Sequence, residues 1–172
     1  MREREDDQRL MSEILETPRL ILRRFRPEDW PDLKDYILRE EVRRFEPPYP
    51  STVEGIMEMA SWLSESLDFW AVSLKQSGKV IGQVHCGLRE QPDWRCRNLG
   101  YVLNPDWWGQ GMATEAAARV MRHGFEDLGC RRFCSGCNPL NIASWKVLEK
   151  LGMRREAHHL LGVAFHRDEA GS

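Results

Sequence analysis

The sequence lacks a long hydrophobic run. None of its apolar stretches approaches the roughly 18 to 20 residues that a membrane-spanning helix requires. Residues 1–8 are largely charged and lack the apolar segment of a secretory signal. We therefore expect a cytoplasmic protein without membrane contact, in which residues 1–16 form a flexible leader and residues 17–172 form a single domain.

An excess of positive charge is also absent. The 25 lysines and arginines are balanced by 27 acidic residues, which leaves a formal net charge of −2. No overall field attracts a polyanion, so we expect no nucleic-acid partner. With 41% hydrophobic and 30% charged residues among 172, the composition is that of one folded domain with a hydrophobic core.

Cysteines are few and lack the spacing of a disulfide framework. There are five, and an odd number of this kind fits a reducing compartment. Cys134 and Cys137 have the C-x-x-C spacing of a zinc pair, but a zinc site needs about four ligands and no second pair exists. We expect no metal, and we interpret these thiols as small buried side chains.

Internal repeats are missing too, so one succession of elements remains. Alternating apolar residues predict strands at 19–25, 69–75, 79–88, 97–103 and 132–137. Helical spacing predicts helices at 27–37, 51–63, 113–128 and 141–150, followed by extended chain from Met153. We expect Asp29 and Ser51 to cap the first two helices. The order predicts an α/β (α+β) fold with helices on both faces of a mixed sheet.

A glycine turn separates the strand at 97–103 from the helix at 113–128. The first N–H groups of a helix have no internal partners, and Gly109 and Gly111 let the backbone approach an anion closely. The turn lacks the Gly-Lys-Ser/Thr of a Walker loop and the third glycine of the dinucleotide fingerprint. Taken alone, it fits either a phosphate-binding loop or an ordinary structural turn.

The sequence around this turn resembles that of a known family. Residues 99–105 (LGYVLNP) and 108–116 (WGQGMATEA) resemble the central motif of the GNAT acetyltransferase superfamily, and residues 138–153 (NPLNIASWKVLEKLGM) resemble its second acetyl-CoA motif. Residues 18–23 (PRLILR) resemble the opening strand of its ribosomal-protein alanine N-acetyltransferase-like branch, the RimJ/RimL type. The resemblance covers about residues 17–160.

This resemblance implies a fold and a reaction. The expected fold is the GNAT acyl-CoA N-acyltransferase fold, with a mostly antiparallel central sheet. The expected reaction moves an acetyl group from acetyl-CoA to a primary amine, either a protein N-terminus or a small-molecule amine, by direct attack. The alternative is an acetyl-CoA-binding module of the same fold with weak catalysis.

The resemblance also implies which residues hold acetyl-CoA. In the family, the pantetheine arm enters a gap between two splayed strands and pairs with exposed backbone groups, while loop amides hold the pyrophosphate. The strand residues here would be Tyr101, Val102 and Leu103, and the loop residues Gly109, Gln110, Gly111, Met112, Ala113 and Thr114. Trp108 stands where the family often has Arg or Gln; it either packs beneath the loop or covers the adenine.

Two polar residues follow in the second motif. Asn141 matches an asparagine that binds the pantetheine arm in relatives, although it is equally suited to be a helix N-cap. Ser144 lies one helical turn further on, and in this branch a hydroxyl there can protonate the departing thiolate. The alternative for Ser144 is a hydrogen bond to a carbonyl of its own helix.

The general base remains unassigned. Relatives commonly carry a glutamate where this sequence has Asn98, which cannot accept a proton from an amine. The substitutes considered are Glu90, His85 and the region of Glu156 and His158.

The C-terminal region departs from the family as well. Residues 164–172 are short and polar, so a seventh strand is expected to be missing or replaced. An unpaired sheet edge would favour a homodimer formed by strand exchange.

Overall fold

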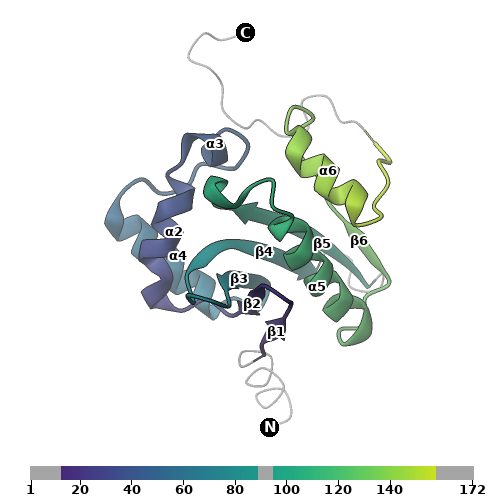
Figure 1. Cartoon of the computed structure of the whole chain (residues 1–172), viewed down its shortest axis with the longest axis horizontal. Coiled ribbons are helices and arrows are strands. Elements are labelled where there is room, and N and C mark those ends of the chain that lie inside the picture. The colour runs from purple at the N-terminus through teal and green to yellow at the C-terminus, as the bar shows by residue number, and fades with distance from the viewer. Residues whose placement is uncertain (1–12, 89–94, 158–172) are drawn as a thin grey trace.

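A single mixed sheet organises the molecule. The structure is a computed structural model that describes residues 13–88 and 95–157 (Figure 1). Within them the strand order is β1-β2-β3-β4-β5-β6. The strands are Leu15–Glu16 (β1), Leu20–Arg23 (β2), Phe69–Leu74 (β3), Val80–Leu88 (β4), Cys96–Leu103 (β5) and Arg132–Cys134 (β6). All neighbours pair antiparallel except β5 and β6, which run parallel because a helix connects them.

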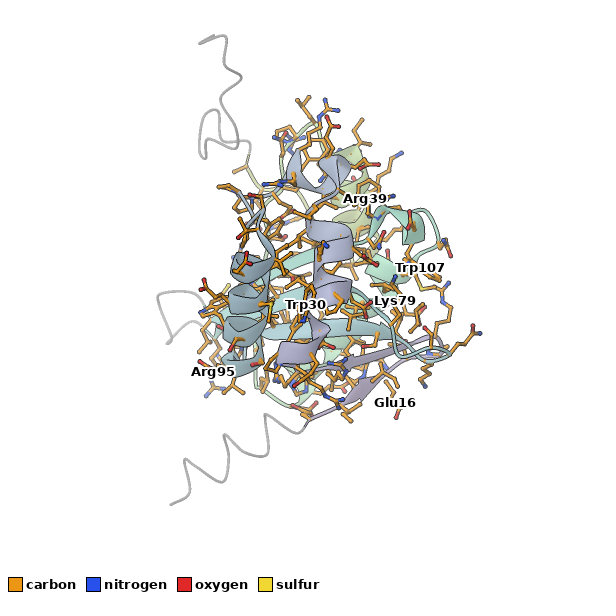
Figure 2. All side chains as sticks on the ribbon, turned by 90° about the vertical axis from the view of Figure 1, so that its left-hand side faces the viewer. Glu16, Trp30, Arg39, Lys79, Arg95 and Trp107 are labelled. Atoms are coloured by element: carbon orange, nitrogen blue, oxygen red, sulfur yellow. The ribbon has the colours of Figure 1, made fainter. Side chains whose placement is uncertain are left out.

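Helices cover both faces of this sheet, as predicted. One layer contains α2 (Trp30–Ile37), α3 (Glu40–Arg43) and α4 (Val53–Glu65); the other contains α5 (Met112–Glu126) and α6 (Ile142–Lys150). Successive side chains of a strand point to opposite faces, so Trp70 and Val72 pack in the core under α5 while Ala71 packs under α2 and α4. Figure 2 looks onto the first of these layers, with Trp30 at the start of α2 and Arg39 just before α3.

Several local predictions differ from the structure. Thr52, not Ser51, caps α4, because the Thr52 hydroxyl accepts from the Gly55 N–H at 3.2 Å. Asp29 does not cap α2 through its side chain; its carboxylate closes the preceding 3-10 turn by accepting from the Arg26 N–H at 2.8 Å. The short helix α3 was not predicted at all.

The N-terminal boundary also moves. Leu15 and Glu16, assigned from sequence to a flexible leader, pair with β2 and extend the sheet. The prediction for residues 1–16 is therefore wrong at its last residues, and residues 1–12 lie outside the described chain. Leu15 is buried, and its contribution to the core explains why a two-residue strand is held in place.

The parallel pairing of β5 with β6 is short. It joins Cys96 to Arg132, Arg97 to Phe133 and Asn98 to Cys134, and it ends there. Ser135 then donates its hydroxyl to the Leu99 carbonyl at 2.7 Å, so a side chain takes the acceptor that a longer ladder would use. For this reason β6 ends at Cys134 instead of the predicted 137. Beyond that point β5 continues to Leu103 with β4 on one side and without β6 on the other. The two chains diverge beyond this point.

The far edge of the sheet bears on the C-terminal prediction. Residues 153–157 follow α6 without joining the sheet, and among the described strands β6 is the last in the order. Residues 158–172, including the segment at 164–172, lie outside the described chain. Homodimerisation across this edge therefore stays a prediction.

Candidate functional site

A cavity of about 270 Å³ lies where β5 diverges from β6. Three parts of the chain form its walls: α3 with the residues after it, the end of β5 with the loop leading to α5, and α6. It brings together Ser144 and all the predicted cofactor residues except Gln110, namely Tyr101, Val102, Leu103, Gly109, Gly111, Met112, Ala113, Thr114 and Asn141. Segments far apart in the sequence thus meet at one site.

The glycine turn has the backbone shape that an anion cradle requires. Gly109 and Gly111 have φ angles of +72° and +77°, in the left-handed region that disfavours other residues. Gly111 is the N-cap of α5, so the first amides of that helix, from Met112 onward, have no helical acceptors. These N–H groups and the helix dipole create positive potential at the mouth of the cavity.

An ion pair anchors this turn, and it was not predicted from sequence. Nη1 of Arg19 donates to the Gln110 carbonyl at 3.0 Å, while Nε of Arg19 donates to Oε2 of Glu115 at 2.7 Å. The hydroxyl of Thr17 donates to the other Glu115 oxygen at 2.6 Å. The carbonyl of Gln110 is therefore bound by Arg19, and Gln110 is absent from the lining of the cavity. Because Arg19 and Glu115 lie almost a hundred residues apart in the sequence, their pairing produces no local pattern from which it could be predicted.

The backbone of β5 offers unpaired groups to the gap. The N–H of Asn104 donates to the Ile81 carbonyl at 2.8 Å, which fixes which β5 residues bond to β4. By alternation Val102 faces Gln83, while the backbone groups of Tyr101 and Leu103 point toward the gap. The prediction for Val102 is thus wrong for its backbone, although its side chain lines the cavity.

Trp108 lies between the loop and this strand. Its Nε1–H donates to the Leu103 carbonyl at 2.8 Å, and the ring is 44% exposed. The indole therefore takes one of the backbone groups at the gap and ties the loop to the strand end. This contact supports the packing role considered from the sequence.

Two hydroxyl groups meet on the wall formed by β5 and α6. The Tyr101 hydroxyl donates to the Ser144 carbonyl at 2.7 Å, and its oxygen lies 3.2 Å from Ser144 Oγ. Because a phenol has one proton, Ser144 is the donor in the second contact. Burial raises the pKa of Tyr101 to about 12, so this hydroxyl stays protonated at neutral pH. The Tyr101 hydroxyl was not foreseen as a partner of Ser144.

Asn141 has the capping role that its residue type allows. Its Oδ1 accepts from the Ser144 N–H at 3.1 Å at the start of α6. The side chain also lines the cavity, so its amide NH₂ remains to donate to a ligand. Both interpretations of Asn141 are therefore compatible.

Two of the substitutes considered for the base, His85 and Glu156, do not line the cavity. His85 packs its ring against Phe69, with centroids 4.7 Å apart, and burial lowers its pKa. Glu156 pairs with Arg132 and Arg154 at the surface. Glu90 and His158 lie outside the described residues. His85 and Glu156 are thus wrong candidates.

The cavity does contain a carboxyl group that the sequence did not single out. Glu46 lines it, and burial raises the pKa of this side chain to about 7. The hydroxyl of Tyr49 lies 3.5 Å from Glu46 Oε2. The signal available was weak, since Glu46 stands in a proline-rich loop that was expected only to border a substrate pocket.

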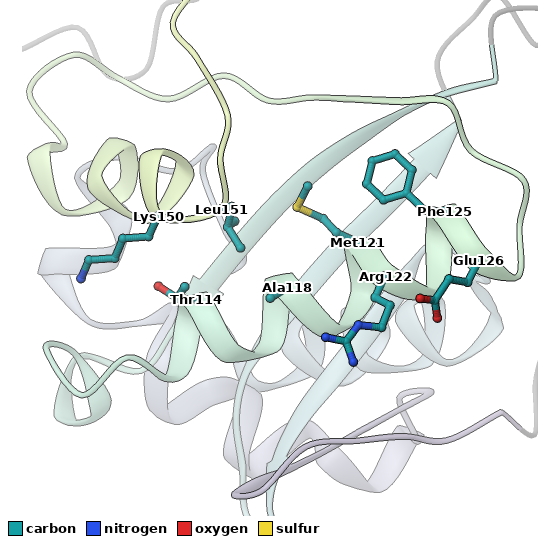
Figure 3. A pocket seen from close by; sticks show the side chains of 8 residues that line it. All are labelled: Thr114, Ala118, Met121, Arg122, Phe125, Glu126, Lys150 and Leu151. Atoms are coloured by element: carbon teal, nitrogen blue, oxygen red, sulfur yellow. The ribbon is translucent and has the colours of Figure 1, made fainter.

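A second hollow, of about 380 Å³, lies beside the first between α5 and α6 (Figure 3). Thr114 and Lys150 line both hollows, so the two join at the start of α5. Met121 and Leu151 give this groove an apolar floor, with Arg122 and Glu126 on α5 beside it. A long ligand leaving the first cavity past the phosphate turn would meet this surface.

One histidine cluster gathers side chains of the types that bind metals. Within the described chain, Glu13, His123 and Asp127 have donor atoms close together. The His123 ring is buried, with Nδ1 at 2.8 Å from Asp127 and Nε2 at 3.2 Å from Glu13. These contacts bring the N-terminal segment against α5. Cys134, from the C-x-x-C pair, has Cys96 Sγ at 3.3 Å.

Comparison with known proteins identifies the family. Residues 19–154 match the family described as the acetyltransferase (GNAT) domain. The chain belongs to the GNAT acetyltransferase family. It is similar to YnaD of Bacillus subtilis, named an uncharacterized N-acetyltransferase, with 29% identity over 141 residues that cover 81% of this chain and 82% of the relative.

Solved structures agree with this assignment. An acetyltransferase of the GNAT family from Bacillus anthracis has a TM-score of 0.79 and 26% identity, covering 84% of this chain and 86% of its own. RimJ of Mycobacterium smegmatis, in complex with CoA-disulfide, has a TM-score of 0.73 and 21% identity over 86% of this chain and 78% of its own. The GNAT resemblance, the predicted fold and the acyltransferase class are confirmed. Solved structures named RimJ and RimL share this fold. None of the helices in the described residues is long and apolar enough to cross a membrane.

Proposed function

We propose that this acetyltransferase transfers the acetyl group of acetyl-CoA to a primary amine, on a protein N-terminus or a small molecule, by direct attack. One observation carries the proposal: an open strand edge, a glycine turn at a helix N-terminus and a pair of hydroxyls border the same cavity. The strand edge suits a thioester, the glycine turn suits a pyrophosphate, and the hydroxyls suit a leaving thiolate. The GNAT family uses acetyl-CoA, and a CoA complex is known for a structural neighbour.

The turn is suited to the pyrophosphate. Amides at the start of α5 donate to its oxygens, and each such charged bond contributes about 1.5–3 kcal/mol. Any other residue at position 109 or 111 would have to adopt this left-handed backbone conformation, at a cost of about 1–2 kcal/mol. This backbone conformation supports the assignment of the turn to the pyrophosphate.

The strand edge is suited to the pantetheine arm and the thioester. Backbone N–H groups of Tyr101 and Leu103 point into the gap, where one can polarise the thioester carbonyl and stabilise the developing oxyanion. The amide of Asn141 is available to the arm from the opposite wall. Holding both substrates in one cavity supplies much of the remaining rate gain.

The leaving group needs a proton. Ser144 is the proposed donor to the thiolate, and Tyr101 is its hydrogen-bond partner. Because the Ser144 proton is directed at Tyr101 in the free protein, the hydroxyl must rotate toward sulfur during the reaction. The tyrosine then serves as the second proton source of a two-hydroxyl relay.

The need for a neutral amine favours acceptors whose amino group has a low pKa. An α-amino group, with a pKa of about 7.7 to 8.0, is roughly one-tenth neutral at pH 7, whereas a lysine side chain is neutral about once in a few thousand molecules. This difference favours an N-terminal amine or a small amine of low pKa over lysine. The RimJ/RimL-type neighbours act on ribosomal proteins by name, which agrees with a peptide N-terminus as acceptor.

A binding module with weak catalysis is the second candidate. Asn98 favours it, because this residue pairs with Cys134 in the sheet and cannot act as a base. Both candidates bind acetyl-CoA, and thermal shift tests this binding. A ligand at 100 times its Kd stabilises the folded protein by about 2.7 kcal/mol. Release of free CoA thiol with a panel of peptide N-termini and small amines then separates the candidates. Binding without any release above background would favour the module.

A further inference from the structure

The two sides of the cavity carry different chemistry. Glu46 follows α3, whereas Tyr101 and Ser144 belong to β5 and α6, and α3 and α6 flank the end of β5 (Figure 1). Of the described residues that line the cavity, only Glu41 and Glu46 carry a carboxyl group, and none is a histidine. A carboxyl on one wall and a hydroxyl pair on the other is the arrangement that an acid–base reaction requires.

Glu46 is also the better placed of these two carboxyls. It is partly buried and lies beside the Tyr49 hydroxyl, while Glu41 is exposed. The loop is tied back to α3, because Nη2 of Arg43 donates to the Tyr49 carbonyl at 3.1 Å. The side chain of Glu46 is thus held at the cavity by its neighbours.

The burial of Glu46 at the cavity leaves its carboxyl able to change protonation near neutral pH. Tyr49 of the same loop contacts it, and the other titratable groups that line the cavity are Glu41 from α3, Tyr101 from β5, and Lys146 and Lys150 from α6. Burial raises the pKa of Glu46 to about 7, and the hydrogen bond from Tyr49 opposes that rise. Burial also raises the pKa of Tyr49, which keeps its hydroxyl a donor. Glu46 can therefore accept a proton at neutral pH and release it again.

We propose that Glu46 is the general base that takes the proton of the attacking amine. This role rests on the proposed function. The nitrogen lone pair forms the C–N bond to the thioester carbon, and one nitrogen proton passes to the Glu46 carboxylate. The C–S bond then breaks with its electron pair on sulfur, and the thiolate receives a proton from Ser144. Tyr101 returns a proton to Ser144 and takes one from solvent in its place. Glu46 finally releases its proton to solvent.

The test compares four variants with the parent in acetyl transfer: Glu46→Gln, Glu46→Asp, Glu40→Gln and Glu41→Gln. Glu46→Gln keeps the shape of the side chain and removes the base, so kcat/KM should fall by about 10²-fold with an unchanged acetyl-CoA Kd. In the parent, kcat at saturating amine should rise with pH through about 7, and this limb should be absent in Glu46→Gln. Glu46→Asp should retain the limb at reduced rate. Glu40→Gln, which removes an exposed charge from the nearby helix α3, is the matched control.

Measuring the pH profile with two amines of different pKa distinguishes the titration of the enzyme from the titration of the substrate. A limb that follows the amine, or one that disappears in Glu41→Gln but stays in Glu46→Gln, overturns the role of Glu46. That role is equally overturned if Glu46→Gln matches the parent in rate and pH profile. If Glu46→Gln loses acetyl-CoA affinity, the profile of Glu46→Asp decides instead. A parent that binds acetyl-CoA but acetylates no amine overturns the proposed function itself, and the base with it.

Discussion

Arg19 and Glu115 are joined across 96 residues by a 2.7 Å hydrogen bond from Nε to Oε2. Through it, the chain at the start of β2 holds the first turn of α5 and, by way of the Gln110 carbonyl, the glycine turn. Burial would raise the pKa of Glu115, but hydrogen bonds from Thr17 and Arg19 outweigh it and lower the pKa. The carboxylate is therefore the charged form that the anchor requires at neutral pH.

Loss of this anchor should weaken cofactor binding. Arg19→Lys keeps the charge but cannot bridge Glu115 and Gln110 with one planar group. Exposed ion pairs contribute only about 0–1 kcal/mol, so we expect acetyl-CoA to bind up to about 5-fold more weakly, because the turn becomes less ordered. Calorimetric titration measures the change. Lys75→Ala, which breaks the exposed pair with Glu16, should leave the affinity unaltered.

Gly111→Ala tests the glycine turn directly. The methyl group meets only Arg19, at 3.6 Å, so the effect comes from the φ of +77° and not from crowding. A left-handed alanine costs about 1–2 kcal/mol, which predicts an affinity for acetyl-CoA about tenfold lower. Gly136→Ala has open space and no positive φ, and it serves as the control in the same titration. Equal affinities for the two variants would contradict the assignment of this loop.

Removal of each hydroxyl of the Tyr101–Ser144 pair should lower kcat by a different amount. Ser144→Ala removes the proposed donor and should lower kcat by up to about 10²-fold while sparing acetyl-CoA affinity. Tyr101→Phe keeps Ser144 but removes its partner, so a smaller loss of kcat is expected. Steady-state rates with one amine at saturation measure both. A Ser144→Ala enzyme as fast as the parent would exclude Ser144 from the mechanism.

The same carboxyl that is proposed as base should reduce stability at high pH. The folded-state pKa of Glu46, about 7, lies above the ordinary value of 4.5, so the folded chain retains a proton that the unfolded chain has lost between these values. The free energy of unfolding should therefore fall as pH rises through this window. Glu46→Gln removes the effect, so its Tm should exceed that of the parent at pH 8 but not at pH 4.5. At this chain length each kcal/mol shifts Tm by about 2–4 °C.

Features that depend on neighbouring residues were predictable from the sequence. The turn before α5 follows from two closely spaced glycines, Gly109 and Gly111, and the cap formed by Asn141 follows from its position before α6. The backbone role of Val102 was predicted wrongly because the bond from Asn104 to Ile81 sets the register, and no residue near Val102 encodes it. Glu46 and the Tyr101–Ser144 contact depend on packing between distant segments. Only the folded chain reveals which carboxyl lies in the cavity.

The three walls of the cavity have a consequence for biosynthesis. The first wall begins at Glu41 and the last ends at Lys150, so most of the chain must be present before the site exists. A nascent chain that has not yet released α6 from the ribosome has the glycine turn but only part of the pocket. Acetyl-CoA would therefore engage at the end of synthesis, when it favours the completed domain over partly folded states by mass action. Cellular supply of the cofactor would in this way influence how much enzyme matures.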